Sequence, residues 1–167
     1  MSSSHFRKLR QSQSFNPEAV QSYLAFLDRV DVFPCLYFHH GILRNTIRRY
    51  ETLWIPLLAG VAKAERASLL PPLDVEWAWV CHTRSPWRYC DDMQLLLEPG
   101  VISDTPIDRS FGIQFIVDAD DREAGYAKAE VLWNEKYGDE PFDICEDLSF
   151  CPVIDDDEES VGRNVRV

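Results

Sequence analysis

The chain has 167 residues, of which 46% are hydrophobic and 12% aromatic, enough for one domain with a real hydrophobic core. Its formal net charge of −11 argues against general nucleic-acid binding, because a surface that binds phosphate must be positive. No apolar run reaches the roughly 20 residues of a membrane-spanning helix, and the polar, basic start does not have the pattern of a secretory signal. We therefore expect a protein of the cytoplasm, or of the nucleus, that has no membrane partner.

The charge is distributed unevenly along the chain. Up to Leu70 there are nine lysines and arginines and five acidic residues, which gives a formal net charge of +4. From Pro71 onward there are eight basic and 23 acidic residues, which gives a formal net charge of −15. We interpret this as a solvated acidic half beside a mildly basic one. The alternative is that the two halves attract each other, or that each binds a different partner.

Two long segments in the first half have helical signals. Residues 1–15 are polar and basic and predict a disordered arm. A helix should follow, since Asn16 can cap it and Pro17 suits its first position, and Pro34 should end or interrupt it. Residues 38–65 then predict a long helix or a kinked pair.

The second of these segments contains its own interruption and a run of arginines. Pro56 predicts a kink or break near Trp54. Arg44, Arg48 and Arg49 lie largely off the apolar stripe and should face solvent or an acidic partner. Phe38 should pack at the helix entry as a hydrophobic staple.

Residues 71–97 predict a helical corner. Two consecutive prolines make the chain extended, and Asp74 is then well placed as an N-cap. Residues 75–83 should form about two helical turns. Ser85 followed by Pro86 predicts a second helix start, over residues 86–97. Three tryptophans in this corner should bury a large apolar area; they are Trp77, Trp79 and Trp87.

The rest of the chain predicts one more long helix. Residues 98–112 are rich in turn residues and predict a loop, and residues 113–117 could be a short strand or a helix start. A helix should follow within residues 118–143 and stop at Gly138. The fold class is therefore mainly α: a single-domain irregular helical bundle over residues 16–150, with a Trp-rich helix-turn-helix corner and a disordered acidic tail over residues 151–167.

The corner also raises three chemical hypotheses. The first is a nucleophilic Cys–His pair formed by Cys81 and His82. Adjacent helical residues point about 100° apart, so these two side chains cannot form a catalytic dyad with each other. A zinc site could combine His82 and Cys81, or Cys90, with His39 or His40, although no strong ligand pair has local metal spacing. A DNA-reading helix-turn-helix would need a basic recognition helix, and this region is acidic.

The structural interpretation of the same residues competes with these hypotheses. Asp74 would cap its helix, Tyr89 would anchor through its hydroxyl, and His82 would bridge buried groups, for instance a backbone carbonyl or an acid such as Asp74. The candidate functional or structural motif consists of Asp74, Trp77, Trp79, Cys81, His82, Pro86 and Tyr89.

The cysteines indicate free thiols. Their number is odd, no CxxC pair occurs, and the spacings do not form a zinc-finger framework. The five cysteines are Cys35, Cys81, Cys90, Cys145 and Cys151.

Three blocks of this chain resemble the glycine-rich domain-containing protein-like family, a domain of unknown function. The first block is "RRYETLWIPLLA" (48–59), and the third is "AEVLWNEKYGDEPFD" (129–143). The second block is the corner itself, through Pro71-Pro72-Leu73-Asp74-Val75, Trp77, Trp79, Cys81-His82, Pro86 and Tyr89. The blocks occur in the family's order over roughly residues 38–143.

The resemblance implies a domain without assigned catalytic residues. Plant members of the family join it to an RNA-binding-like segment and a glycine-rich tail, and they are linked to stress and developmental responses. This chain has seven glycines and neither segment, which argues against an RNA role. It ends soon after the third block, so we expect a short member or a fragment of a longer gene product.

Three function hypotheses follow. The leading one is a non-enzymatic interaction or regulatory module with a protein partner, because no catalytic constellation accompanies the tryptophan-rich motif. The alternative is a metal- or thiol-dependent enzyme that uses His82 and Cys81 with His39 or His40, and zinc as cofactor. The third is an RNA-associated protein that binds through its basic first half. The surroundings of His82 should distinguish the first two.

Overall fold

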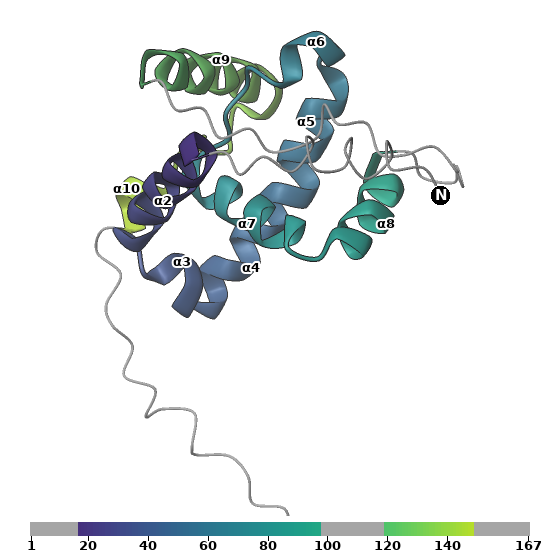
Figure 1. Cartoon of the computed structure of the whole chain (residues 1–167). Helices are drawn as coiled ribbons and strands as arrows, with labels where there is room; N and C mark the ends of the chain where they lie inside the picture. The colour runs from purple at the N-terminus through teal and green to yellow at the C-terminus, as the bar shows by residue number, and fades with distance from the viewer. Residues whose placement is uncertain (1–16, 98–118, 149–167) are drawn as a thin grey trace, which may run out of the picture.

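A computed structural model describes residues 17–97 and 119–148, and most of these residues are helical (Figure 1). The helices are α2 (Pro17–Asp31), α3 (Cys35–Phe38), α4 (His40–Arg49), the π-helix η1 (Tyr50–Trp54), α5 (Ile55–Gly60), α6 (Lys63–Arg66), α7 (Leu73–Thr83), α8 (Pro86–Leu97), α9 (Ala119–Tyr137) and α10 (Cys145–Leu148). No strand occurs in the two described ranges. The prediction of a mainly α bundle is confirmed.

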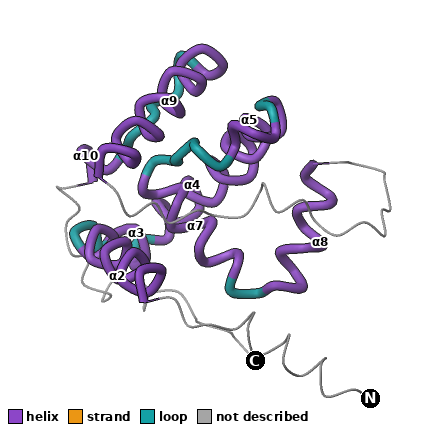
Figure 2. Tube along the Cα trace, turned by 45° about the horizontal axis from the view of Figure 1, so that its top comes forward, coloured by secondary structure: helices purple, strands orange, loops and turns teal. Residues whose placement is uncertain are grey.

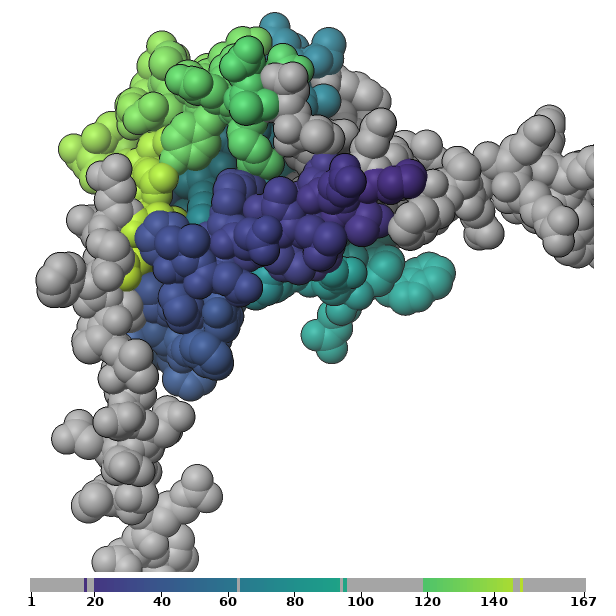
Figure 3. All heavy atoms as spheres, turned by 60° about the vertical axis from the view of Figure 1, so that its left-hand side comes forward, coloured from purple at the N-terminus to yellow at the C-terminus, as the bar shows by residue number. Residues whose placement is uncertain are grey.

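Helix α7 lies at the centre of the bundle. It packs against α2, α4, η1 and α8, while α9 packs against α5 (Figure 2). Viewed as spheres, α2 lies across one face, with α9 above it and the α3–α4 region below (Figure 3). None of the described helices is long and apolar enough to cross a membrane.

Two hydrophobic clusters flank α7, and α7 contributes to both. Val75 and Trp79 belong to the larger cluster, whereas Leu73 and Val80 belong to the smaller one. A helix buried on two sides must be apolar around most of its circumference, which explains its tryptophan-rich sequence. The larger cluster also contains Tyr50, Trp54, Ile55, Leu57, Leu58, Leu69, Met93, Ala129, Trp133 and Phe142; the smaller contains Phe26, Val30, Leu36 and Cys145.

The interruption predicted at Pro56 takes the form of a π-helix. Proline has no backbone N–H, so the α-helical hydrogen bond to the carbonyl of Thr52 cannot form. The helix widens instead, and the backbone N–H of Ile55 donates to the carbonyl of Tyr50, five residues earlier. The chain therefore continues in one direction, and both Tyr50 and Trp54 are buried.

The corner forms, but two details of its prediction are wrong. The second helix starts at Pro86 as predicted, and the N–H of Tyr89 donates to the carbonyl of Ser85 at 2.8 Å. Asp74 does not cap α7, because the helix begins at Leu73, and Asp74 is instead a fully buried residue of its first turn. Trp87 is 85% exposed, so only two of the three tryptophans contribute to the core.

The helix ends predicted at Pro17 and Gly138 agree with the structure, whereas the predicted packing of Phe38 does not. Helix α2 starts at Pro17, and α9 ends at Tyr137, directly before Gly138, as predicted. Phe38 is 76% exposed and so does not act as a buried staple; the side chain of His39 caps α4 instead. The predictions for residues 1–15, the 98–112 loop, residues 113–117 and the acidic tail lie outside the described residues.

Candidate functional site

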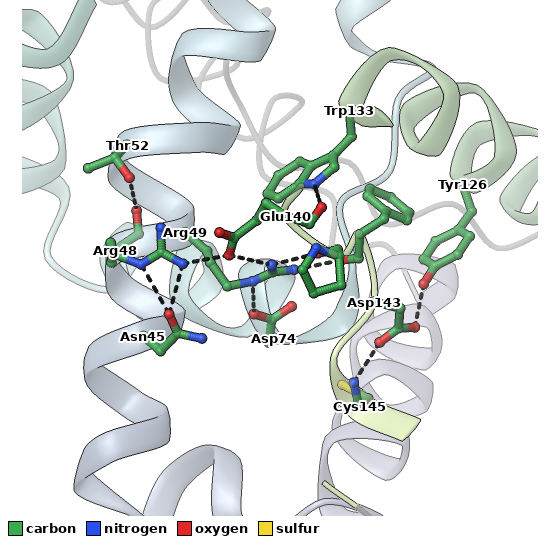
Figure 4. A network of polar contacts seen from close by, with 12 residues as sticks. Asn45, Arg48, Arg49, Thr52, Asp74, Tyr126, Trp133, Glu140, Asp143 and Cys145 are labelled. Atoms are coloured by element: carbon green, nitrogen blue, oxygen red, sulfur yellow. Dashed lines mark hydrogen bonds and ion pairs between the residues drawn. The ribbon is translucent and has the colours of Figure 1, made fainter. Parts of the chain in front are cut away.

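The strongest concentration of polar contacts in the described fold surrounds Arg49, at the end of α4 (Figure 4). Its side chain is fully buried, and its Nε donates to Oδ2 of Asp74 at 2.7 Å. Its Nη1 and Nη2 donate to the carbonyls of Pro141 and Phe142 at 2.7 and 2.6 Å. The guanidinium also lies 5.0 Å from the ring centroid of Trp133. A charge this deeply buried is tolerated because it is paired and its donors are used.

Glu140 closes this arrangement at the surface. Its Oε1 accepts from Nη1 of Arg49 at 3.2 Å and from Nη2 of Arg48 at 2.5 Å. Its backbone carbonyl accepts from the indole N–H of Trp133 at 2.9 Å. We call the set Arg49, Asp74, Glu140, Pro141 and Phe142 the Arg49 clamp, because it holds the chain after α9 against α4 and α7.

The two carboxylates of the Arg49 clamp have opposite pKa shifts. Burial raises the pKa of Asp74, and the adjacent Arg49 offsets only part of that effect. Burial also acts to raise the pKa of Glu140, but the hydrogen bonds and charges of Arg48 and Arg49 outweigh it and lower that pKa. Glu140 is therefore the carboxylate that stays ionised most readily.

The second polar group lies in the corner and includes His82. The hydroxyl of Tyr50 lies 3.0 Å from Nδ1 of His82, and Nε2 of His82 lies 3.2 Å from Oδ2 of Asp92. Burial raises the pKa of Tyr50 well above its usual range, so its hydroxyl keeps its proton. Both ring nitrogens of His82 therefore have a polar partner, Nδ1 in Tyr50 and Nε2 in Asp92. This row of hydrogen bonds connects η1, α7 and α8.

Tyr89 completes the corner. Its hydroxyl accepts a hydrogen bond from the indole N–H of Trp79 at 3.1 Å. The rings of Tyr89 and His82 meet edge-to-face with centroids 4.9 Å apart. His82 thus bridges groups on neighbouring helices, but through Tyr50 and Asp92 rather than through Asp74.

A third group connects α7 with two distant helices. Glu76 is almost fully buried, and its Oε2 lies 2.9 Å from Nη2 of Arg29 on α2 and 3.8 Å from Nη1 of Arg122 on α9. Its Oε1 has no hydrogen-bond partner among the described residues. The sequence analysis did not single out this carboxylate.

The residues proposed for a metal or thiol site do not assemble into one. His39 uses Nδ1 to accept from the backbone N–H of Ile42, and His40 is exposed. Partial burial raises the pKa of the Cys81 thiol, an effect that Arg84 partly offsets, and this disfavours a reactive thiolate. Within residues 17–97 and 119–148, no three His, Cys, Asp or Glu side chains are grouped to hold a metal ion.

The cysteines of the described ranges are free thiols, as predicted; they are Cys35, Cys81, Cys90 and Cys145. Cys151 lies outside those ranges. Cys35 and Cys145 are buried, whereas Cys81 and Cys90 are exposed.

The sequence interpretation missed the Arg49 clamp. It placed Arg49 off the apolar stripe, facing solvent or an acidic partner, whereas the side chain is buried with Asp74. One signal could have revealed it: each of the three blocks contains one member of the group Arg49, Asp74 and Glu140, whose charges are complementary. The three blocks therefore meet at one buried guanidinium.

Comparisons with known proteins give two relatives in Arabidopsis thaliana. Glycine-rich domain-containing protein 2 is 33% identical over 129 residues, which are 75% of this chain and 15% of that relative. Glycine-rich domain-containing protein 1 is 34% identical over 129 residues, 75% of this chain and 14% of that relative. No family model and no solved structure matches the chain.

Proposed function

Because the chain belongs to the glycine-rich domain-containing protein-like family, we propose that its helical domain is a non-enzymatic interaction or regulatory module that binds another protein. One observation carries the proposal: the three blocks of the resemblance meet at Arg49, which uses its donors inside the fold. A buried guanidinium that donates to two backbone carbonyls and a buried carboxylate stabilises the fold. Its burial keeps a substrate from reaching it.

The corner supports the same proposal. His82 has one nitrogen on Tyr50 and the other facing Asp92, so both ring nitrogens are occupied by the protein. Desolvation raises the pKa of the Cys81 thiol, which disfavours the thiolate that nucleophilic catalysis requires. These residues therefore favour a structural role over the metal or thiol chemistry that the sequence left open.

The proposal is tested with purified protein and the Cys81→Ala, His82→Gln double variant. We expect the double variant to melt at a lower temperature, because the bridge between η1, α7 and α8 is lost. We also expect that metal analysis after dialysis against a chelator finds no stoichiometric ion in the wild type. A wild-type protein that retains one metal ion per chain, together with a variant that loses it at unchanged melting temperature, would contradict the proposal.

The nature of the partner needs a separate measurement. Titration of the wild type with single-stranded RNA should give no binding above a neutral control protein, because the formal net charge of the whole chain is −11. Tight, salt-dependent RNA binding would replace the protein-partner proposal with the RNA-associated alternative.

A further inference from the structure

One side of α4 is exposed and basic. Its solvent-facing side chains recur at intervals of three and four residues, so they share one helical face; they are His40, Arg44, Ile47 and Arg48. Residues 33–50 contain no aspartate or glutamate, although the whole chain has 28 acidic residues. We call this surface the α4 basic face.

The α4 basic face has an unpaired cation and exposed apolar side chains. Arg44 forms no ion pair or hydrogen bond with another described residue. Arg48 is bound to Glu140, but its side chain is still 45% exposed. Phe38, which directly precedes this part of the chain, is 76% exposed, and Ile47 is 45% exposed. A segment with both apolar and acidic side chains would therefore complement this surface.

The described chain ends beside the same surface. Helix α10 ends at Leu148, whose backbone carbonyl accepts from the thiol of Cys35 at 3.7 Å. Cys35 is the first residue of α3, which packs against α4. Figure 3 shows α10 at the side of the α3–α4 region. Whatever follows Leu148 therefore starts next to the α4 basic face.

The sequence after α10 has the complementary composition. Five consecutive acidic residues occupy positions 155–159, and they directly follow Val153 and Ile154. Asp155 comes seven residues after Leu148, which is a reach of up to about 24 Å for an extended chain. The exposed side of α4 is only about 12 Å long, at eight residues of helix. The acidic residues can therefore reach every position on it.

We propose that residues 153–159 bind the α4 basic face of their own chain. The acidic residues pair with Arg44 and Arg48, and the apolar pair packs against Phe38. The order along the chain agrees with this arrangement, because the apolar pair comes first and Phe38 lies nearer to Cys35 than the two arginines do. The contact is held by exposed ion pairs, so added salt weakens it.

The tether selects this occupant over an acidic segment of another protein. A short connection gives an effective concentration on the order of millimolar, so contacts that are individually weak suffice within one chain. An acidic partner from outside would have to displace residues 153–159 before it could use this surface. The inference goes beyond the proposed function, since it needs no second protein.

Zero-length cross-linking of the full chain tests the contact. A carbodiimide joins a carboxylate to a lysine amine only where the two groups touch. Arg44→Lys places such an amine on the α4 basic face and keeps the charge, and Arg88→Lys does the same on the exposed side of α8 as the matched control. We expect Arg44→Lys to be joined to residues 155–159 in the monomer, with loss of this product at high salt. Arg88→Lys should give no such product.

Three results would overturn the inference. They are the absence of a product between position 44 and residues 155–159, equal yields for the two lysine variants, and a product found only in covalent dimers. The last result would assign the contact to a neighbouring copy. Equal melting temperatures of both variants and the wild type show that the fold is intact.

A second measurement uses a chain in which the acidic residues are replaced by their amides. The changes are Asp155→Asn, Asp156→Asn, Asp157→Asn, Glu158→Gln and Glu159→Gln. Comparison with the wild type by NMR should show amide shift changes in residues 38–48 and none in α8. Unchanged shifts in residues 38–48 would contradict the inference. The proposed function would be unaffected, because the metal and stability measurements test it separately.

Discussion

The guanidinium of Arg49 and the carboxylate of Asp74 lie 2.7 Å apart with both side chains fully buried. They come from two different sequence blocks, and the third block supplies Glu140 and the two carbonyls that bind the same guanidinium. The three blocks of this chain that carry the resemblance therefore meet at one buried polar contact. This explains why charged residues occur within the apolar core of the domain.

Replacing Arg49 should be far more damaging than replacing its neighbour. Arg49→Met leaves Asp74 buried without its counter-charge, which should cost about 3–5 kcal/mol of unfolding free energy. Arg48→Met removes a side chain that is 45% exposed, and its ion pair with Glu140 should contribute only about 0–1 kcal/mol. Urea denaturation of the two variants measures both values. Equal losses for the two arginines would show that the Arg49 clamp is not a buried, energetically distinct site.

Acid should destabilise the fold partly through Glu140. Its pKa is lowered in the folded protein, so its contribution is fully present above its unfolded pKa, near 4.3, and is lost as the pH falls through the lower folded value. The wild type should therefore lose more stability on acidification than Glu140→Gln. Comparing the two proteins cancels the opposite trend from Asp74, whose folded pKa is raised. Parallel melting-temperature curves for both proteins below neutral pH would contradict this assignment.

Two helical glycines, one packed closely against a neighbouring segment and one in open space, allow a controlled test of core packing. A Cβ at Gly125 of α9 would lie 2.7 Å from the backbone oxygen of Ser68, whereas a Cβ at Gly60 of α5 would meet nothing within 4 Å. Gly125→Ala should therefore destabilise the fold by about 1–3 kcal/mol through overpacking. Gly60→Ala should be neutral or stabilise it by up to about 1 kcal/mol, because alanine favours helix. A stabilising Gly125→Ala would show that α9 is not held closely against the segment before α7.

The hydroxyl of Tyr50 should stabilise the corner through His82. Tyr50→Phe keeps the buried ring but leaves Nδ1 of His82 without its hydrogen-bond partner, which should cost about 1–2 kcal/mol. Faster hydrogen exchange of α8 amides should accompany this loss, since the row of hydrogen bonds ends on Asp92 of that helix. Tyr137→Phe is the control, because its hydroxyl bonds a backbone carbonyl of η1 instead. Unchanged α8 exchange in Tyr50→Phe would argue against the bridge.

Local signals were enough to predict where α2 and α8 begin and where α9 ends. Pro17, the Ser85–Pro86 pair and Gly138 act through neighbouring backbone groups, so their effects can be read from a few residues. Pro56 likewise predicted a disturbance near Trp54, although its form as a π-helix depends on how the next turn packs.

Contacts between distant segments could not be predicted in the same way. Arg49 meets carbonyls of residues 141 and 142, more than 90 positions later, and nothing in its own helix reveals them. Asp74 has the position of a capping acid. An acidic residue near a helix start is favourable whether it caps the helix or pairs with a cation, so the sequence pattern alone favoured capping, the commoner of these two roles. Trp87 was assigned to the core because aromatic residues usually are, but its helical face points away from α5 and α7.

The central claim is that the three family blocks are joined by a buried scaffold contact, and a double-mutant cycle between Arg49 and Asp74 tests it most directly. Unfolding free energies are measured for wild type, Arg49→Met, Asp74→Leu and the double variant. The account predicts that the double variant loses far less than the sum of the single losses, with a coupling of about 1–3 kcal/mol, because removing both charges leaves neither one buried alone. Additive losses would contradict it.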